Sequence, residues 1–168
     1  MRSLARVSMI ALFAGCATIP STTHTVAQSV DDSIRLVGVW KPVEIFIASN
    51  ATAHAGDKAG PAGPGLWFFA AHHYAVLDVH TTESRPPLPP SEPTAAQLMA
   101  TWGPFGANAG TYQVEGGTIT MQPTVAKNPQ LMTPGRKVTL SYRVEGDTLW
   151  LWGLSGRPTE MVKHVRVD

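Results

Sequence analysis

The chain is poor in the residues and motifs that most often identify a reaction. Among its 168 residues there is one cysteine, Cys16, and charged side chains make up 15% of the sequence, against a typical value of about 25%. A single thiol excludes a disulfide within the chain. A glycine-rich phosphate loop, a Gly-x-Ser-x-Gly elbow and a Cys-x-x-Cys pair are also missing. The sequence therefore predicts no cofactor and assigns no reaction.

Charges of the two signs are nearly balanced. Thirteen Lys and Arg residues against twelve Asp and Glu residues give a formal net charge of +1. No cluster of basic residues favours nucleic acid as a partner. In place of charge, five Trp, five Phe and three Tyr residues supply apolar surface. A small protein of this composition has either a large core or an apolar cavity.

The first 27 residues have the composition of an export signal. Arg2 and Arg6 give a basic start, an apolar run follows at 7–15, and a segment rich in Pro, Ser and Thr comes next. The apolar run is too short to span a membrane as a helix. We therefore expect an exported protein, periplasmic or secreted, with no membrane span.

Two processing sites fit this signal. Cleavage after Ala27 would start the mature chain at Gln28 and remove Cys16. It would also remove two of the 13 basic and none of the 12 acidic residues, which leaves 11 against 12 and a formal charge of −1. Alternatively, residues 13–16 resemble a bacterial lipobox, which would place a lipid anchor on Cys16, although Phe13 stands where such motifs favour Leu.

Short stretches of alternating apolar and polar residues occupy the second half of the chain. Val138, Leu140, Tyr142 and Val144 alternate with polar residues, which is the period of a strand with one buried face. Glycine-containing turns separate such stretches and indicate hairpins. Eight strands are expected, over 36–47, 66–69, 73–80, 112–115, 118–123, 136–144, 148–153 and 160–167.

These strands predict an all-β fold. After the signal (1–27) and a polar lead-in (28–35), residues 36–168 suffice for one domain. Eight antiparallel strands in hairpin order favour a closed up-and-down β-barrel, which encloses either packed side chains or one small ligand.

The first strand is expected to place Trp40, Glu44 and Phe46 on one face. Pro42 lacks an amide hydrogen, so we expect an edge or a bulge where it interrupts this strand.

The long connections are expected around the barrel mouth. Residues 48–65, rich in Ala and Gly, read as a loop, and 83–93, with five prolines, are expected to cross the mouth in extended form. Residues 94–102 have the spacing of a short helix, with Ser91 or Thr94 as its N-cap. We expect this helix to lie over the open end.

The helix would then bring two aromatic side chains, Trp102 and Phe105, to plug the core from the mouth.

Several segments together resemble the bacterial lipocalin-like domain family, a group of calycin-type β-barrels. The first strand contains Gly38-Val39-Trp40, the Gly-x-Trp signature of these folds. The further matching segments are GLWFF (65–69), HHY (72–74), WGPFGANAGTY (102–112), VAKNP (125–129) and YRVEGDTL (142–149). The resemblance covers nearly all of 36–168 and implies an antiparallel barrel, often exported, with no agreed reaction.

The resemblance also implies how one end of the barrel is closed. Arg166 in the last strand stands where these folds place a basic residue against the signature Trp, here Trp40. A guanidinium stacked on an indole contributes about 0.5 to 2 kcal/mol through cation–π attraction. We interpret this pair as structural.

Our first functional hypothesis is an exported protein that binds a small, mainly apolar molecule inside its barrel. Arg85 and Lys127 are the candidates for a cationic rim around the mouth. The candidates for the cavity lining are aromatic and polar side chains of the expected strands: Trp67, Phe69, Tyr74, Asp78, His80, Tyr112 and Tyr142. A register slip of one residue would exchange the inward and outward sets.

Two alternatives stay open. A barrel enzyme of the cyclase or isomerase type would need a buried base, and Glu44, His73 and His80 are the candidates. A solid-cored structural envelope protein would instead expose Trp150 and Trp152 as an apolar patch. The histidines and carboxylates at 72–83 lack a third metal ligand marked on another strand, so we predict no metal site.

Overall fold

The computed structural model describes residues 34–47, 58–154 and 157–167, so the signal segment and its processing sites lie outside the described residues. Helix α2 (Ala95–Trp102) and the 3₁₀ helix η1 (Pro129–Met132) accompany the strands. The strands are β1 (Gly38–Ile47), β2 (Lys58–Pro61), β3 (Gly65–Phe69), β4 (His73–Val79), β5 (Phe105–Glu115), β6 (Thr118–Ala126), β7 (Val138–Glu145), β8 (Thr148–Leu154) and β9 (Arg157–Arg166).

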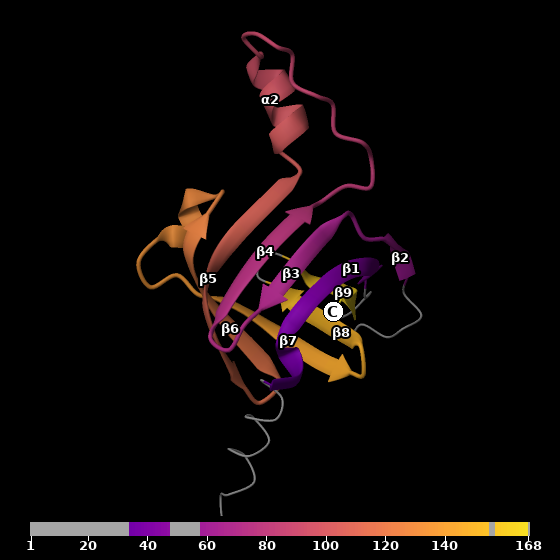
Figure 1. The fold of residues 1–168 in the computed structure, drawn as a ribbon, viewed down its shortest axis with the longest axis vertical. Coiled ribbons are helices and arrows are strands. Elements are labelled where there is room, and N and C mark those ends of the chain that lie inside the picture. Colours follow the sequence, from indigo (N-terminus) through magenta and orange to yellow (C-terminus); the bar gives the residue numbers. More distant parts are fainter. Residues whose placement is uncertain (1–33, 48–57, 155–156, 168) are drawn as a thin grey trace, which may run out of the picture.

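These strands form one antiparallel sheet that closes on itself. From β3 to β9 each strand pairs with the next along the chain, and β1 pairs with β9 to complete the ring (Figure 1). Both β2 and β3 pair with β1, at Glu44↔Pro61 and Trp40↔Trp67 respectively, so the two short strands occupy one position beside it. The result is an eight-stranded up-and-down barrel with no free sheet edge at the seam.

In β7 the buried side chains are the apolar ones of the alternating sequence pattern. Val138, Leu140, Tyr142 and Val144 are all buried, and Lys137, Thr139 and Arg143 are exposed. The hairpin between β5 and β6 turns through Gly116 and Gly117, which both have positive φ, as the favoured two-residue hairpin turn requires. The prediction of an all-β, eight-stranded antiparallel barrel with one short α-helix is confirmed.

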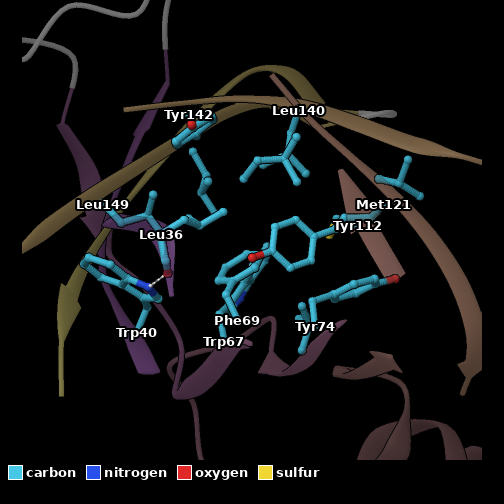
Figure 2. Packing of buried hydrophobic residues seen from close by; sticks show 14 of the residues in the cluster. Leu36, Trp40, Trp67, Phe69, Tyr74, Tyr112, Met121, Leu140, Tyr142 and Leu149 are labelled. Atoms are coloured by element: carbon cyan, nitrogen blue, oxygen red, sulfur yellow. Dashed lines mark hydrogen bonds between the residues drawn. The ribbon is translucent and has the colours of Figure 1, made fainter. Parts of the chain in front are cut away.

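Side chains fill the barrel interior toward the end where β3 and β4 are joined (Figure 2). The largest of these side chains are aromatic, and Phe69 and Tyr112 meet edge to face with ring centres 5.2 Å apart. The Tyr112 hydroxyl donates to the carbonyl of Ala70 at 2.7 Å, and the Tyr74 hydroxyl donates to Oδ1 of Asn108 at 2.7 Å. Burial raises the pKa of both tyrosines, that of Tyr74 to about 12.

A tryptophan and an arginine close this end. Trp40 is fully buried, and its indole donates to the carbonyl of Leu36 at 2.8 Å, the bond drawn in Figure 2. The guanidinium of Arg166 lies over the Trp40 ring and donates to the carbonyls of Val37 and Arg35, both at 2.8 Å. The barrel therefore has one packed end, and its other end, where β4 leaves and β5 begins, is the mouth.

The helix stands away from the barrel instead of covering it. Figure 1 shows α2 projecting beyond the ends of β4 and β5, and none of its residues is buried. Thr94 is the N-cap, in a reciprocal capping box with Gln97. None of the helices in the described parts of the chain is long and apolar enough to cross a membrane.

The expectation that Trp102 and Phe105 plug the core is wrong. The Trp102 side chain is 47% exposed and packs edge-on against Phe105, with ring centres 6.1 Å apart. Only Gly103 and Pro104 separate α2 from β5, and Figure 1 shows the helix projecting away from the mouth. The proline-rich segment rises beside α2, where Thr101 Oγ1 donates to the carbonyl of Pro86 at 2.8 Å, and does not cross the mouth (Figure 1).

Strand β5 is longer than the sequence indicated. It begins at Phe105, seven residues before the expected start, and its small residues hid the alternating pattern. At Gly110 a side chain would place its Cβ 2.1 Å from the carbonyl oxygen of Gln122, so this close approach at a β-bulge requires glycine. Asn108 and its neighbours are therefore paired in the sheet and do not form a turn.

The bulge expected at Pro42 is present, and it changes which residues share a face. The register of β1 against β9 shifts between Pro42 and Glu44. Before the shift Trp40 points into the barrel, whereas beyond it Phe46 packs outside, against Trp150 with ring centres 5.5 Å apart. The expectation that Trp40, Glu44 and Phe46 share one face is therefore wrong, because one extra residue in a strand reverses the faces that follow.

Candidate functional site

A cavity of about 370 Å³ opens at the mouth, above the packed end. Its apolar wall comes from Pro42 and Ile45 of β1, Leu151 of β8 and Val162 of β9. Residues of the two connections at the mouth, at 61–63 and 81–83, border it as well. The volume lies in the range of small-molecule pockets, about 300 to 1,000 Å³.

Trp67 and Asp78 form the polar floor of this cavity. The indole Nε1 of Trp67 donates to both carboxylate oxygens of Asp78, at 3.0 Å each. The carboxylate fits because its cross-strand neighbour is Gly65, where a Cβ would lie 2.3 Å from Oδ1 of Asp78. The bond fixes the indole plane and the carboxylate relative to each other across β3 and β4.

His164 completes the floor from β9. It is 1% exposed, lines the cavity and packs edge to face against Trp67, with ring centres 5.3 Å apart. Neither ring nitrogen makes a hydrogen bond of regular geometry to the described residues. Burial lowers the pKa of His164 to about 4, and the nearby backbone of Val162 and Leu149 offsets this only partly.

At neutral pH the His164 ring is therefore uncharged. A neutral imidazole presents one N–H donor and one acceptor nitrogen. Buried polar groups in folded proteins nearly always have hydrogen-bond partners, so an enclosed ring without one of regular geometry is a costly group in the barrel interior.

A second cavity, of about 400 Å³, adjoins the first. Trp67, Asp78 and His80 line both cavities. The second cavity differs from the first in its charged residues, because Lys127 and Arg136 line it.

The barrel is thus closed by eight antiparallel strands in up-and-down order, packed at one end and hollow at the other. The fold is a lipocalin-like β-barrel. This confirms the fold implied by the resemblance of the sequence to bacterial lipocalin-like domains.

Comparisons of the lipocalin-like barrel with known proteins return few matches. Among solved structures, a lipocalin-like protein from Bacteroides uniformis is similar at 14% identity and a TM-score of 0.43, over 79% of this chain and 98% of that chain. An uncharacterized protein from Bacteroides eggerthii is similar at 9% identity and a TM-score of 0.41, over 77% of this chain and 98% of that chain. No protein-family model matches the chain, and no curated protein does.

The seven lining candidates fall into two groups in this lipocalin-like barrel. Trp67, Asp78 and His80 border the cavities. The other four belong to the packed core below them: Phe69, Tyr74, Tyr112 and Tyr142. In the first group, Trp67 lies in the middle of β3, Asp78 near the end of β4, and His80 directly after β4.

The rim candidates Arg85 and Lys127 lie together on Phe105, with Arg85 Cζ 5.6 Å and Lys127 Nζ 6.0 Å from the ring centre. Arg85 donates to the carbonyl of Thr101, and Lys127 donates to those of Trp102 and Phe105. Both cations therefore donate hydrogen bonds to carbonyls at or just beyond the C-terminal end of α2. Positive charge at the C-terminal end of a helix is stabilising.

Among the three candidate bases, the structure brings one to a cavity. Glu44 lies on the outer face, where it forms an ion pair with Lys163 at 3.5 Å, because the bulge in β1 turns it outward. His73 is exposed, and His80 lines both cavities. In the described part of the chain no three His, Cys, Asp or Glu side chains are grouped to hold a metal ion.

Trp150 and Trp152 do not form the exposed patch that the structural alternative requires. Both are half-buried, and their neighbours Leu149 and Leu151 point into the core. The Trp150 ring is covered by Phe46 and has the cations of Arg143 and Lys163 5.9 and 5.7 Å from its centre.

His164 is the site residue that sequence reasoning missed. A period-two signal was present, because His164 stands two residues before Arg166 and so shares the inward face of the last strand. His164 belongs to the site because its ring packs against Trp67, which is distant in sequence. The two residues meet because β1 pairs with β3 on one side and with β9 on the other.

Proposed function

We propose that this lipocalin-like protein binds a small, mainly apolar molecule in the cavity at its mouth. The observation that carries the proposal is the combination of an apolar wall, at Ile45, Leu151 and Val162, with a small polar floor at Trp67, Asp78 and His164. Most small-molecule sites have this composition, because burial supplies affinity and a few polar groups set orientation.

We further propose that the protein is exported through its first 27 residues. The basic start and short apolar run support this proposal. Mass spectrometry of the protein from its producing cells tests it. A chain that begins at Gln28, or a lipid-modified Cys16, agrees with export, and an unprocessed Met1 would contradict it.

Binding is tested first by native mass spectrometry of protein purified from its producing cells, followed by organic extraction of any bound molecule. A copurifying compound would supply the ligand's chemistry. In parallel, the fluorescent apolar probe N-phenyl-1-naphthylamine reports occupancy of the cavity in the empty protein.

Variants locate the probe. Val162→Trp and Ile45→Trp fill the cavity, so each is expected to weaken probe binding at least tenfold. Val125→Trp makes the same change at a 66% exposed position of β6 that lines neither cavity, and it should leave binding unchanged. Equal binding by all four proteins would refute the assignment, as would absence of binding to the unmodified protein.

A further inference from the structure

The wall of the second cavity is rich in hydrogen-bond donors. Four side chains supply them, one from β5 and three from the connection between β6 and β7: Asn108, Lys127, Asn128 and Arg136. Apolar side chains of β4, β6, η1 and β7 form much of the remaining wall: Val76, Met121, Leu131 and Val138. This cavity therefore combines an apolar wall with donors gathered on two neighbouring segments.

The two asparagine amides have a fixed orientation. Oδ1 of Asn108 accepts a hydrogen bond from the Tyr74 hydroxyl at 2.7 Å. Oδ1 of Asn128 accepts one from the backbone N–H of Gln130 at 3.1 Å. In both amides the acceptor oxygen is thus used within the protein, and the NH₂ group is the end with donors to offer. Neither asparagine is buried, so each presents donors, and not an acceptor, to a ligand in the cavity.

The two cations of the cavity differ in what they already bind. The Lys127 ammonium donates to the carbonyls of Trp102 and Phe105, which uses two of its three hydrogens. Arg136 is exposed, and its guanidinium makes no hydrogen bond or ion pair within the described part of the chain. A guanidinium presents a planar fork of N–H donors that matches the two oxygens of a carboxylate. Arg136 is therefore the cation best placed to pair with a bound acid.

One carboxylate, that of Asp78, also borders this cavity, and it comes from β4. Both of its oxygens accept from the indole of Trp67. The donors belong to β5 and to the connection after β6, so a bound anion would be placed at that side of the cavity and away from Asp78.

We propose that the second cavity is a separate binding site for a small organic acid with an apolar body. The ligand carboxylate pairs with the Arg136 guanidinium, the NH₂ groups of Asn108 and Asn128 donate to its oxygen atoms, and the body packs on the apolar wall. Hydrogen bonds to ionised partners are about twice as strong as neutral ones, so the charge of the ligand should dominate its affinity. This inference goes beyond the proposed function, which concerns the first cavity.

Three probes with the same ring system test the charge preference. Isothermal titration at pH 7.5 and low salt compares 1-naphthoic acid, 1-naphthalenemethanol and 1-naphthylmethylamine. We expect the acid to bind at least tenfold more tightly than the alcohol, and the amine to bind most weakly. An alcohol or amine that binds as tightly as the acid would overturn the inference, as would an acid that does not bind.

A pair of neighbouring variants assigns the effect to the cavity. Arg136→Gln should lower the affinity for the acid at least fivefold, with little change for the alcohol. Lys137→Gln is the matched control, because it removes the same charge from the next residue, which is exposed and lines neither cavity. Equal losses in the two variants would show a response to overall charge and would overturn the inference.

The asparagines give a second, independent test. Asn128→Asp keeps the acceptor for the Gln130 N–H, and Asp caps a helix as well as Asn does, so this exposed variant should fold. It replaces a donor by a negative charge and should lower the affinity for the acid at least tenfold. Gln130→Glu adds the same charge two residues away, outside the cavity lining, and should have a smaller effect. Equal effects of the two variants, or none, would contradict the proposal.

A cavity-filling variant separates this site from the first cavity. Val162→Trp should weaken binding of the apolar probe and leave the affinity for the acid unchanged, because Val162 lines the first cavity alone. A tenfold loss of acid affinity in Val162→Trp would place the acid in the first cavity and overturn the inference. If the unmodified protein binds the acid as expected but not the apolar probe, the proposed function fails and this inference stands.

Discussion

The guanidinium carbon of Arg166 lies 4.1 Å from the centre of the Trp40 ring, and the two residues are direct partners across the paired strands β9 and β1. The contact therefore lies on the seam where the sheet closes. The same guanidinium donates to the carbonyls of Val37 and Arg35, which precede β1. The Arg166 side chain thus contacts both the seam between β1 and β9 and the segment before β1 at the packed end of the barrel.

Replacement of Arg166 should destabilise the barrel as a whole. Arg166→Ala removes a cation–π contact and two hydrogen bonds from a charged donor, so we expect a loss of about 2 to 4 kcal/mol in the free energy of unfolding. Arg143→Ala removes an exposed cation 5.9 Å from the centre of the half-buried Trp150 ring and should cost less than about 1 kcal/mol. Urea unfolding of both variants measures the difference, and equal losses would contradict the closure role.

Gly38 is expected to be required by the same closure. Its φ is +143°, and a Cβ there would lie 2.2 Å from a guanidinium nitrogen of Arg166. Gly60 has a similar φ of +155°, and a Cβ there would have no atom within 4 Å, so Gly60→Ala reports backbone strain alone. We expect Gly38→Ala to cost at least about 1 kcal/mol more than Gly60→Ala in urea unfolding. Equal costs would show that the guanidinium moves aside freely.

His164 should make stability depend on pH. Its folded pKa of about 4 lies below the ordinary value of 6.5, because burial disfavours the charged ring. The folded state therefore binds fewer protons than the unfolded state. The stability contributed is fully present above pH 6.5 and is lost as the pH falls toward 4, by about 3 kcal/mol in total.

The variant His164→Phe isolates this effect. Asp78 and Glu160, which line the same cavity, are present in both proteins, so the difference between the two unfolding curves belongs to His164. Between pH 7.5 and pH 4, urea unfolding of the unmodified protein should lose about 3 kcal/mol more than that of His164→Phe. Parallel pH curves for the two proteins would rule out a buried neutral ring.

Two tryptophans should differ sharply in their contribution to stability. Trp102 is half-exposed on a helix with no buried residue, so Trp102→Ala should cost less than about 1 kcal/mol. Trp67 is buried and holds Asp78 and His164, so Trp67→Leu should cost about 2 to 4 kcal/mol. Thermal unfolding compares them, and a large loss for Trp102→Ala would indicate that α2 packs on the barrel.

The sequence predicted those features that repeat along a single strand or turn. The alternation at 138–144 indicated the buried face of β7 correctly, because side chains of a strand point to opposite faces with a period of two. The hairpin glycines and the bulge at Pro42 were also predictable, since φ preference and a missing amide hydrogen are local properties. The start of β5 was missed, because glycine and alanine carry no alternating pattern.

The site could be predicted only in part. Trp67, Asp78 and His80 lie close together in sequence on the strands β3 and β4 and just beyond them, and all three border the cavities. The prediction of Glu44 as a buried base failed because it carried the alternating pattern across the bulge, which reverses the face of this residue. A bulge is detectable from sequence, but the number of residues it inserts is set by the pairing with β9.

By itself, the sequence determined the number of barrel positions and the hairpin order of the strands, because both depend on short-range periodicity and turn chemistry. The pairing of Trp40 with Arg166 at the closed end followed from the resemblance to lipocalin-like domains. The tertiary structure decided what the barrel presents at its mouth. His164 meets Trp67 and Asp78 only when closure places β9, β3 and β4 around one cavity. The direction of α2 also appeared only in the tertiary structure, where the helix projects beyond β4 and β5 and leaves the mouth uncovered.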